Sequence, residues 1–109
     1  MAVSSDYVDF VLEQLAPLGV LTSRKMFGGV GLYANGLFFA LIDDDVLYLK
    51  GDVALKADFE AAGSHAFDPF GEGKPMAYWS APVDALDDSD LLVAWARRSV
   101  EVATARKKR

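Results

Sequence analysis

The stretch of this 109-residue sequence that decides the fold is Arg24-Lys25-Met26-Phe27-Gly28-Gly29-Val30-Gly31-Leu32-Tyr33. An Asn35-Gly36 pair and the apolar segment 37–42 follow it at once. Asn-Gly between two apolar runs is a strong β-hairpin signal, because a type I′ turn needs positive φ at both central positions. The Gly28-Gly29 pair permits a bulge or a sharp bend, since glycine tolerates positive φ. The stretch therefore predicts strands at 21–27, 30–34 and 37–42.

A two-residue turn at Asn35-Gly36 fixes which residues pair across the second of these hairpins. It predicts that Tyr33 pairs with Phe38, Leu32 with Phe39, and Gly31 with Ala40. Because paired residues share a face, one face should hold Gly31, Tyr33, Phe38, Ala40 and Ile42, and the other Val30, Leu32, Leu37, Phe39 and Leu41. Both faces are apolar, so helices must cover both of them or a partner must cover one. We expect part of the sheet to be a protein–protein surface, with a homodimer seam as one version.

The remaining elements follow from apolar spacing and from capping and turn residues. Helices are predicted at 5–16, at 53–62, and from Asp87 or Asp88 to about 104, with a single helical turn at 84–86. Strands are predicted at 46–50 and 76–81, with a short strand at 64–67 before a loop at 68–75. The whole chain, 1–109, is expected to form one α+β domain with an antiparallel meander of about five to six strands, packed with three helices in two layers. Residues 105–109 are expected to form a frayed basic tail.

Composition and charge narrow the classes of function. The chain has no cysteine, which excludes disulfides, thiolate catalysis and cysteine-type zinc sites. Its formal net charge of −5 becomes −9 when the four basic residues at 106–109 are left out. An acidic body repels a phosphate backbone, so no direct nucleic-acid binding is expected. The N-terminal region lacks a basic segment of the signal-peptide kind and no run is long enough to span a membrane, so a cytoplasmic location is expected.

A histidine, an acidic run and two groups of glycines are the candidates for reactive or ligand-binding sites. His65 has Ser64 beside it, but neighbouring side chains on an extended segment point to opposite faces, which is poor geometry for a nucleophile and its base. Asp43-Asp44-Asp45 lacks the spacing, glycine and distal glutamate of a calcium loop and is expected to be a polar turn. The glycines at 28–31 and 71–73 lack the context of a phosphate-binding loop. The sequence therefore predicts no catalytic residue, no metal and no cofactor.

The ordered set of motifs resembles the N-terminal domain of the TfoX/Sxy competence regulators. The resemblance begins with the decisive stretch at 24–33 and spans nearly the whole chain. It continues through Gly36-Leu37-Phe38-Phe39-Ala40, Leu47-Tyr48-Leu49-Lys50, Phe59, Gly63, Phe67, Gly73-Lys74, Met76, Tyr78-Trp79, Asp90, Leu91, Trp95 and Ala96. It implies an α+β domain with an antiparallel sheet, in a family tied to transcriptional regulation of DNA uptake in bacteria. The family supplies no catalytic residues to carry over.

The expected function is therefore a non-enzymatic regulatory or adaptor domain that contacts another protein, with a homodimer as one possibility. Its candidate interaction surface comprises Arg24, Lys25, Met26, Phe27, Gly28 and Gly29, where two cations precede a glycine bend. The alternative is a small-ligand-binding protein or enzyme with a pocket near His65 and the loop at 71–75. A deep cleft lined by His65, Asp68 and Lys74 would favour that alternative.

Overall fold

The computed structural model describes residues 4–26, 28–68, 73 and 76–107. Its element order confirms the α+β class. The elements are α1 (Ser5–Gln14), a 3-10 turn η1 (Ala16–Leu18), β1 (Leu21–Met26), β2 (Gly29–Ala34), β3 (Leu37–Asp43), β4 (Val46–Lys50), α2 (Val53–Ala61), β5 (Ala66–Phe67), β6 (Met76–Ser80), α3 (Val83–Leu86) and α4 (Ser89–Lys107).

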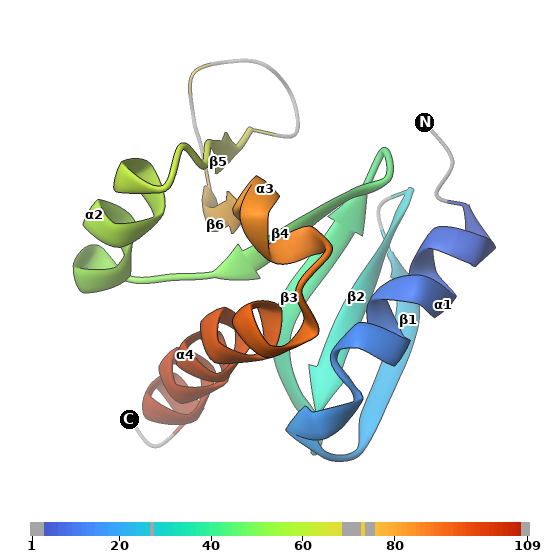
Figure 1. Ribbon diagram of the computed structural model, residues 1–109. Coiled ribbons are helices and arrows are strands. Elements are labelled where there is room, and N and C mark those ends of the chain that lie inside the picture. Colours follow the sequence, from blue (N-terminus) through green and yellow to red (C-terminus); the bar gives the residue numbers. More distant parts are fainter. Residues whose placement is uncertain (1–3, 27, 69–72, 74–75, 108–109) are drawn as a thin grey trace.

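All six strands belong to one antiparallel sheet with the order β1-β2-β3-β4-β6-β5. The first four strands form a meander, and β6 and β5 extend the sheet beyond β4. Helices α1, α3 and α4 lie against one face of this sheet, and α2 lies beside its β5–β6 end (Figure 1). The sheet therefore has one long edge strand, β1, and one two-residue edge strand, β5.

The helices begin where the sequence places capping residues. The Ser4 hydroxyl accepts a hydrogen bond from the backbone N–H of Tyr7, and Asp52 Oδ1 accepts one from Leu55. Asp88 Oδ1 accepts a hydrogen bond from the Leu91 N–H at 3.1 Å, so Asp88 rather than Asp87 caps α4. The last helix continues to Lys107, past the end expected at 104, so residues 105–107 are helical and not part of the expected frayed tail.

Positive φ angles mark the tight turns of the meander. Asn35 and Gly36 have φ of 52° and 83°, which confirms the predicted type I′ turn. Asp44 and Asp45 form a turn of the same kind between β3 and β4, with φ of 51° and 56°. Gly28 has φ of 79° and follows the end of β1, so the predicted sharp bend is the turn that joins the antiparallel strands β1 and β2.

The predicted pairing of β2 with β3 is correct only next to the turn. Tyr33 pairs with Phe38, but Leu32 pairs with Ala40 and Gly31 with Leu41. The register shifts between Leu32 and Tyr33, so β3 carries one extra residue, a β-bulge. The predicted pairs Leu32–Phe39 and Gly31–Ala40 are therefore wrong.

The bulge also changes which side chains share a face. Ala40 and Ile42 pack with the helices, whereas Leu41 belongs to the opposite face, so these three residues were assigned to the wrong faces. Strict alternation cannot hold across a bulge because the extra residue resets it. The local polar and apolar pattern gave no sign of this, since every residue from Leu37 to Ile42 is apolar.

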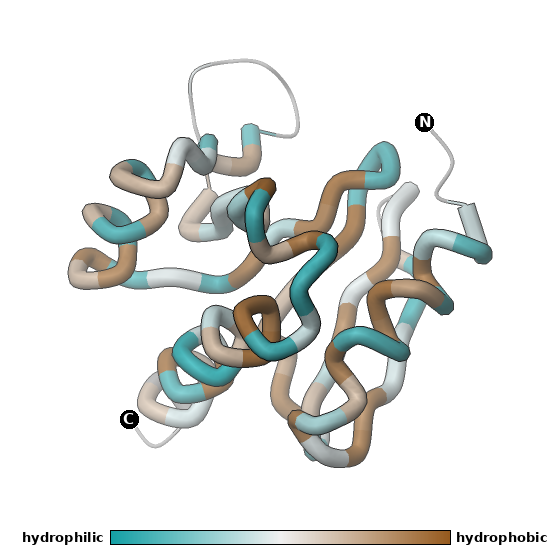
Figure 2. Tube along the Cα trace, viewed as in Figure 1, coloured by the Kyte–Doolittle hydropathy of each residue, from teal (hydrophilic) through white to brown (hydrophobic). Residues whose placement is uncertain are grey.

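The larger of the two clusters of buried side chains lies between the sheet and the helices. Its fully buried members come from both the strands and the helices. They include Val11 of α1, Leu15 at the end of α1, Leu32, Phe39, Ile42, Leu47 and Leu49 of the strands, Phe59 of α2, and Leu92 and Ala96 of α4. Figure 2 shows apolar segments along the central strands and hydrophilic residues at the turn between β3 and β4. Leu92, Ala96, Ser99 and Val102 form the buried stripe of α4, and Trp95 beside them is half-buried.

Candidate interaction surface

The second face of the sheet carries an apolar cluster built from strand residues. Leu41, Tyr48 and Tyr78 form its buried centre, and Phe38, Val46 and Phe67 pack around them. In the part of the chain that the structure describes, no helix residue belongs to this cluster. We call this face the open face. The sequence allowed two arrangements, helices on both faces of the sheet or a partner on one face. Within the described residues, helices do not cover both faces.

Two cations lie over aromatic rings on the open face. The Lys50 ammonium is 5.6 Å from the ring centre of Phe38 and 5.4 Å from that of Tyr78, and it donates a 3.3 Å hydrogen bond to the Tyr78 hydroxyl. The Arg24 guanidinium is 5.7 Å from the ring centre of Tyr33. Contacts of this kind hold a charge against an apolar surface at a gain of about 0.5–1 kcal/mol when exposed. The open face is thus apolar in its centre and positive at these two positions.

The glycines of the decisive stretch let β1 and its neighbours approach closely. A Cβ on Gly31 would lie 2.5 Å from Met26 Cε and 3.0 Å from Phe38 Cε1, so the Met26 side chain occupies the space above Gly31. A Cβ on Gly29 would lie 2.5 Å from the carbonyl oxygen of Ile42 in β3. These contacts explain two of the glycines by packing, and Gly28 by its turn.

The predicted interaction surface lies at the C-terminal end of the edge strand β1 and continues to the first residue of β2. Arg24 and Lys25 are exposed in β1, Met26 and Gly29 are half-buried, and Gly28 is exposed in the turn. Phe27 lies outside the described residues. Arg24 pairs with Gly31 and lies on the open face, while Lys25 pairs with Val30, which packs against the helix-side core. The two cations therefore point to opposite faces, as their adjacent positions in a strand predict.

His65 contacts other residues than the sequence suggested. Its Nδ1 lies 3.2 Å from Ser80 Oγ and its Nε2 3.5 Å from Tyr48 Oη, and its backbone N–H donates to Ser80 Oγ at 3.0 Å. The Tyr48 ring meets the imidazole edge-on at 5.7 Å. These contacts tie β5 to β6 and β4. Part of the predicted ligand pocket, residues 71, 72, 74 and 75, lies outside the described residues.

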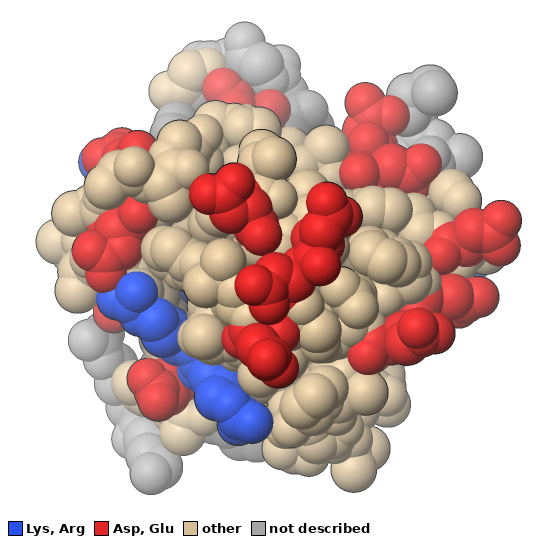
Figure 3. All heavy atoms as spheres, in the orientation of Figure 1, with Lys and Arg blue, Asp and Glu red and all other residues tan. Residues whose placement is uncertain are grey.

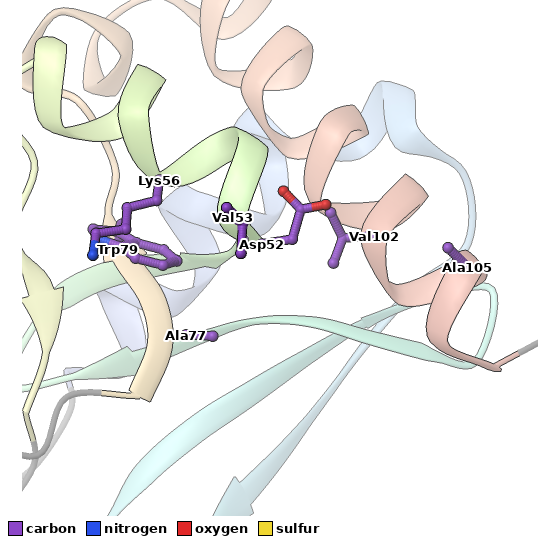
Figure 4. Close-up of a pocket in the computed structure, with 8 residues that line it drawn as sticks. Asp52, Val53, Lys56, Ala77, Trp79, Val102 and Ala105 are labelled. Carbon is purple, nitrogen blue, oxygen red and sulfur yellow. The ribbon is translucent and has the colours of Figure 1, made fainter. Parts of the chain in front are cut away.

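A cavity of about 400 Å³ lies away from His65, between α2, β6 and the end of α4. Gly51, Asp52, Lys56, Trp79 and Val102 are among its lining residues (Figure 4). Asp52 supplies its carboxylate, but Oδ1 already accepts the capping hydrogen bond from Leu55. Within the described residues, no group of three or more histidine or acidic side chains could hold a metal ion.

Acidic side chains dominate the helix-covered face. Figure 3 shows them spread over α1, α3 and the start of α4. The exposed acids of these elements and of the connection between α3 and α4 are Asp6, Asp9, Glu13, Asp84, Asp87, Asp88 and Asp90. Two of the chain's cations, Arg24 and Lys50, lie instead on the open face. The helix-covered side thus exposes many acids, whereas these two cations lie on the opposite side.

Burial raises the pKa of the Tyr48 hydroxyl above its ordinary value of 10, and the charges of Asp43 and Asp44 raise this pKa further. The folded state therefore holds the Tyr48 proton more tightly than the unfolded chain. By linkage, this contribution to stability is complete below the unfolded pKa and is lost as the pH rises through the folded pKa. Tyr7 adds a contribution of the same sign, since burial also raises its pKa.

We expect Tyr48→Phe to flatten the loss of stability at alkaline pH. The free energy of unfolding of the parent protein should fall as the pH rises above ~10, and that of Tyr48→Phe should fall less steeply. Urea unfolding at a series of alkaline pH values measures both slopes. Tyr7→Phe is the matched variant and should flatten the curve as well. Identical slopes for the parent and Tyr48→Phe would contradict the assignment.

Fold and surface together define the class as an α+β domain with a single antiparallel sheet, helices on one face and an aromatic, cation-bearing second face. The chain belongs to the TfoX N-terminal domain family, whose family model matches residues 13–103. It is 42% identical over 50 residues to the DNA transformation protein TfoX1 of Aliivibrio fischeri (strain ATCC 700601 / ES114). That match covers 46% of this chain and 24% of the relative, so this chain corresponds to a part of it. Among the helices of the described residues, none is long and apolar enough to cross a membrane.

Sequence reasoning missed the part that Lys50 and Tyr78 take in this surface. Lys50 ends β4 and Tyr78 lies in β6, and their pairing brings them together across 28 positions. The signal that could have found them is the alternation in β4, where Tyr48 and Lys50 share a face.

Proposed function

We propose that this chain is a regulatory, non-enzymatic domain of the TfoX type that acts in the cytoplasm by contacting another protein. The observation that carries the proposal is the sheet with helices on one face and an aromatic cluster on the other. Within the described residues no helix covers this cluster, whose centre is buried among the strand side chains while Phe38, Val46 and Phe67 at its rim stay half-buried. Apolar surface left accessible in this way often marks an interaction site. The contact region comprises Arg24, Lys25, Met26, Phe27, Gly28 and Gly29, together with the adjoining open face.

Similarity to a DNA transformation protein supports a role in competence. The acidic character of the chain supports a protein partner over direct contact with nucleic acid, since phosphate neutralisation supplies most non-specific DNA affinity. The contacts of His65 with Ser80 and Tyr48 support a structural rather than a catalytic task for this histidine. None of the proposed contacts requires a cofactor or a membrane.

A charge-reversed variant tests the proposal. We expect the parent protein to capture a partner from a lysate of its own organism, and Arg24→Glu/Lys25→Glu to capture much less of the same partner. The matched control is Lys56→Glu/Arg97→Glu, which changes the net charge equally at exposed positions outside the proposed surface. When the gene for Arg24→Glu/Lys25→Glu replaces the parent gene in the organism, the frequency of DNA uptake should fall. The gene for Lys56→Glu/Arg97→Glu should leave this frequency unchanged.

Two results would count against this function. The first is a parent protein that captures nothing and whose loss leaves DNA uptake unchanged. The second is equal capture by the surface variant and its control. Light scattering of the purified protein at high concentration tests the homodimer version, and a strictly monomeric mass would count against a second copy as the partner.

A further inference from the structure

Strand β1 is the long edge of the sheet, and its residues are open to solvent. Thr22, Ser23, Arg24 and Lys25 are all exposed, and among the described residues β1 pairs with β2 alone. The opposite edge, β5, has two residues, both of them half-buried. An edge strand presents a row of backbone donors and acceptors that another extended chain can pair with.

The hydrogen-bond pattern shows which backbone groups point outward. The carbonyl of Val20 accepts a hydrogen bond from the N–H of Asn35 at 2.8 Å, so Val20 bonds toward β2. Along a strand of an antiparallel pair, residues whose backbone groups bond to the neighbouring strand alternate with residues whose backbone groups point away from it. The register of β1 with β2 has no shift, so this alternation holds along β1. Residues 22, 24 and 26 therefore also bond inward, and the backbone groups of Leu21, Ser23 and Lys25 point away from the sheet.

The charges on β1 select the kind of strand that can pair there. Arg24 points to the open face and Lys25 to the helix-covered face, so a strand beside β1 meets one cation on each side. Pairing β1 with β1 of a second copy would gather four cations in one two-stranded ribbon, which like-charge repulsion opposes. A strand with two adjacent acidic residues would place one carboxylate on each face, opposite Arg24 and Lys25.

We propose that β1 accepts an extended, acidic segment of a partner protein as a seventh strand of the sheet. Backbone hydrogen bonds to Ser23 and Lys25 provide the pairing, and Arg24 and Lys25 select an acidic pair at the centre of the segment. This inference rests on the proposed function and specifies the partner of that same surface.

The test uses the whole protein and a capped eight-residue peptide with two central glutamates flanked by threonine and valine. On binding, the amides of Ser23 and Lys25 should exchange with solvent more slowly, while those of Thr22 and Arg24, already bonded to β2, change little. Hydrogen exchange followed residue by residue by NMR measures this contrast. Ser23 and Lys25 alternate with Thr22 and Arg24 along the strand. The exchange rates of Thr22 and Arg24 are therefore the control for those of Ser23 and Lys25.

Two further peptides separate backbone pairing from charge attraction. A peptide with two central lysines should bind about tenfold more weakly, because it replaces two exposed ion pairs by two contacts between like charges. A tenfold change corresponds to about 1.4 kcal/mol. The glutamate peptide with N-methyl groups on alternate residues keeps its charge but loses donors, and it should lose binding. For Arg24→Glu/Lys25→Glu, the preference should reverse toward the lysine peptide.

The strand addition is overturned if Ser23 and Lys25 gain no protection, or if the N-methylated peptide binds as well as the parent peptide. These results leave the proposed function standing when the parent protein still captures a partner that the charge-reversed variant releases. Conversely, an absent partner with protected Ser23 and Lys25 amides contradicts the proposed function and supports the edge as a strand acceptor.

Discussion

Phe59→Ala should lower the free energy of unfolding by about 3–5 kcal/mol, as truncation of a fully buried phenylalanine typically does. The Phe59 side chain is 0% exposed and joins three elements. Its ring stacks on Trp79 of β6 at 5.8 Å and on Trp95 of α4 at 4.7 Å, so α2 is attached to the core through this one side chain and Leu55. Domains of this kind have a total stability of about 5–15 kcal/mol, so the loss would be a large part of the whole.

Tryptophan fluorescence during urea unfolding measures this effect directly. The chain has two tryptophans, and both of them stack on Phe59, so the folded-state spectrum should change along with the midpoint. Phe10→Ala is the matched control, because it removes the same atoms from a side chain that is 43% exposed, and it should cost about 1 kcal/mol or less. Equal losses for the two variants would contradict the packing described for Phe59.

The turns and the sheet order near them were predictable because their signals are local. Asn35-Gly36 can adopt positive φ at both positions, and that requirement fixed the hairpin and the Tyr33–Phe38 pair. Capping worked for the same reason, since Ser4, Asp52 and Asp88 bond to backbone groups three residues away. Such interactions join residues that are close in the sequence, so they can be predicted from the sequence alone.

The bulge in β3 and the composition of the open face could not be predicted in this way. Where Leu37 to Ile42 are all apolar, either register buries apolar side chains, and packing against the helices decides between them. The Lys50–Tyr78 contact depends on β6 returning beside β4 after a helix and a loop. The proposed interaction surface at 24–29 stays a prediction; the structure shows only that residues 24–26 lie in the edge strand β1.

Gly29→Ala should destabilise the domain by about 3 kcal/mol, in the upper part of the range for an overpacked position. A Cβ at Gly29 would lie 2.5 Å from the carbonyl oxygen of Ile42, which is backbone of a central strand and fully buried. Relief of this clash requires β2 and β3 to separate, and separation weakens the ladder from Val30–Ile42 to Leu32–Ala40. Urea unfolding measures the loss.

Gly31→Ala provides the comparison that isolates the cause. Its Cβ would meet Phe38 Cε1 at 3.0 Å and, more closely, the Met26 methyl group at 2.5 Å. Because that methyl group is the far end of a flexible side chain, Met26 can move, and the cost should be about 1 kcal/mol. Met26→Ala in the same chain removes that contact, and the double variant should therefore lose less than the sum of the two single variants. The same substitution should give no relief to Gly29→Ala, because the atom nearest to its Cβ is the backbone oxygen of Ile42. A Gly29→Ala protein as stable as the parent would show that β2 and β3 approach less closely than the structure has them.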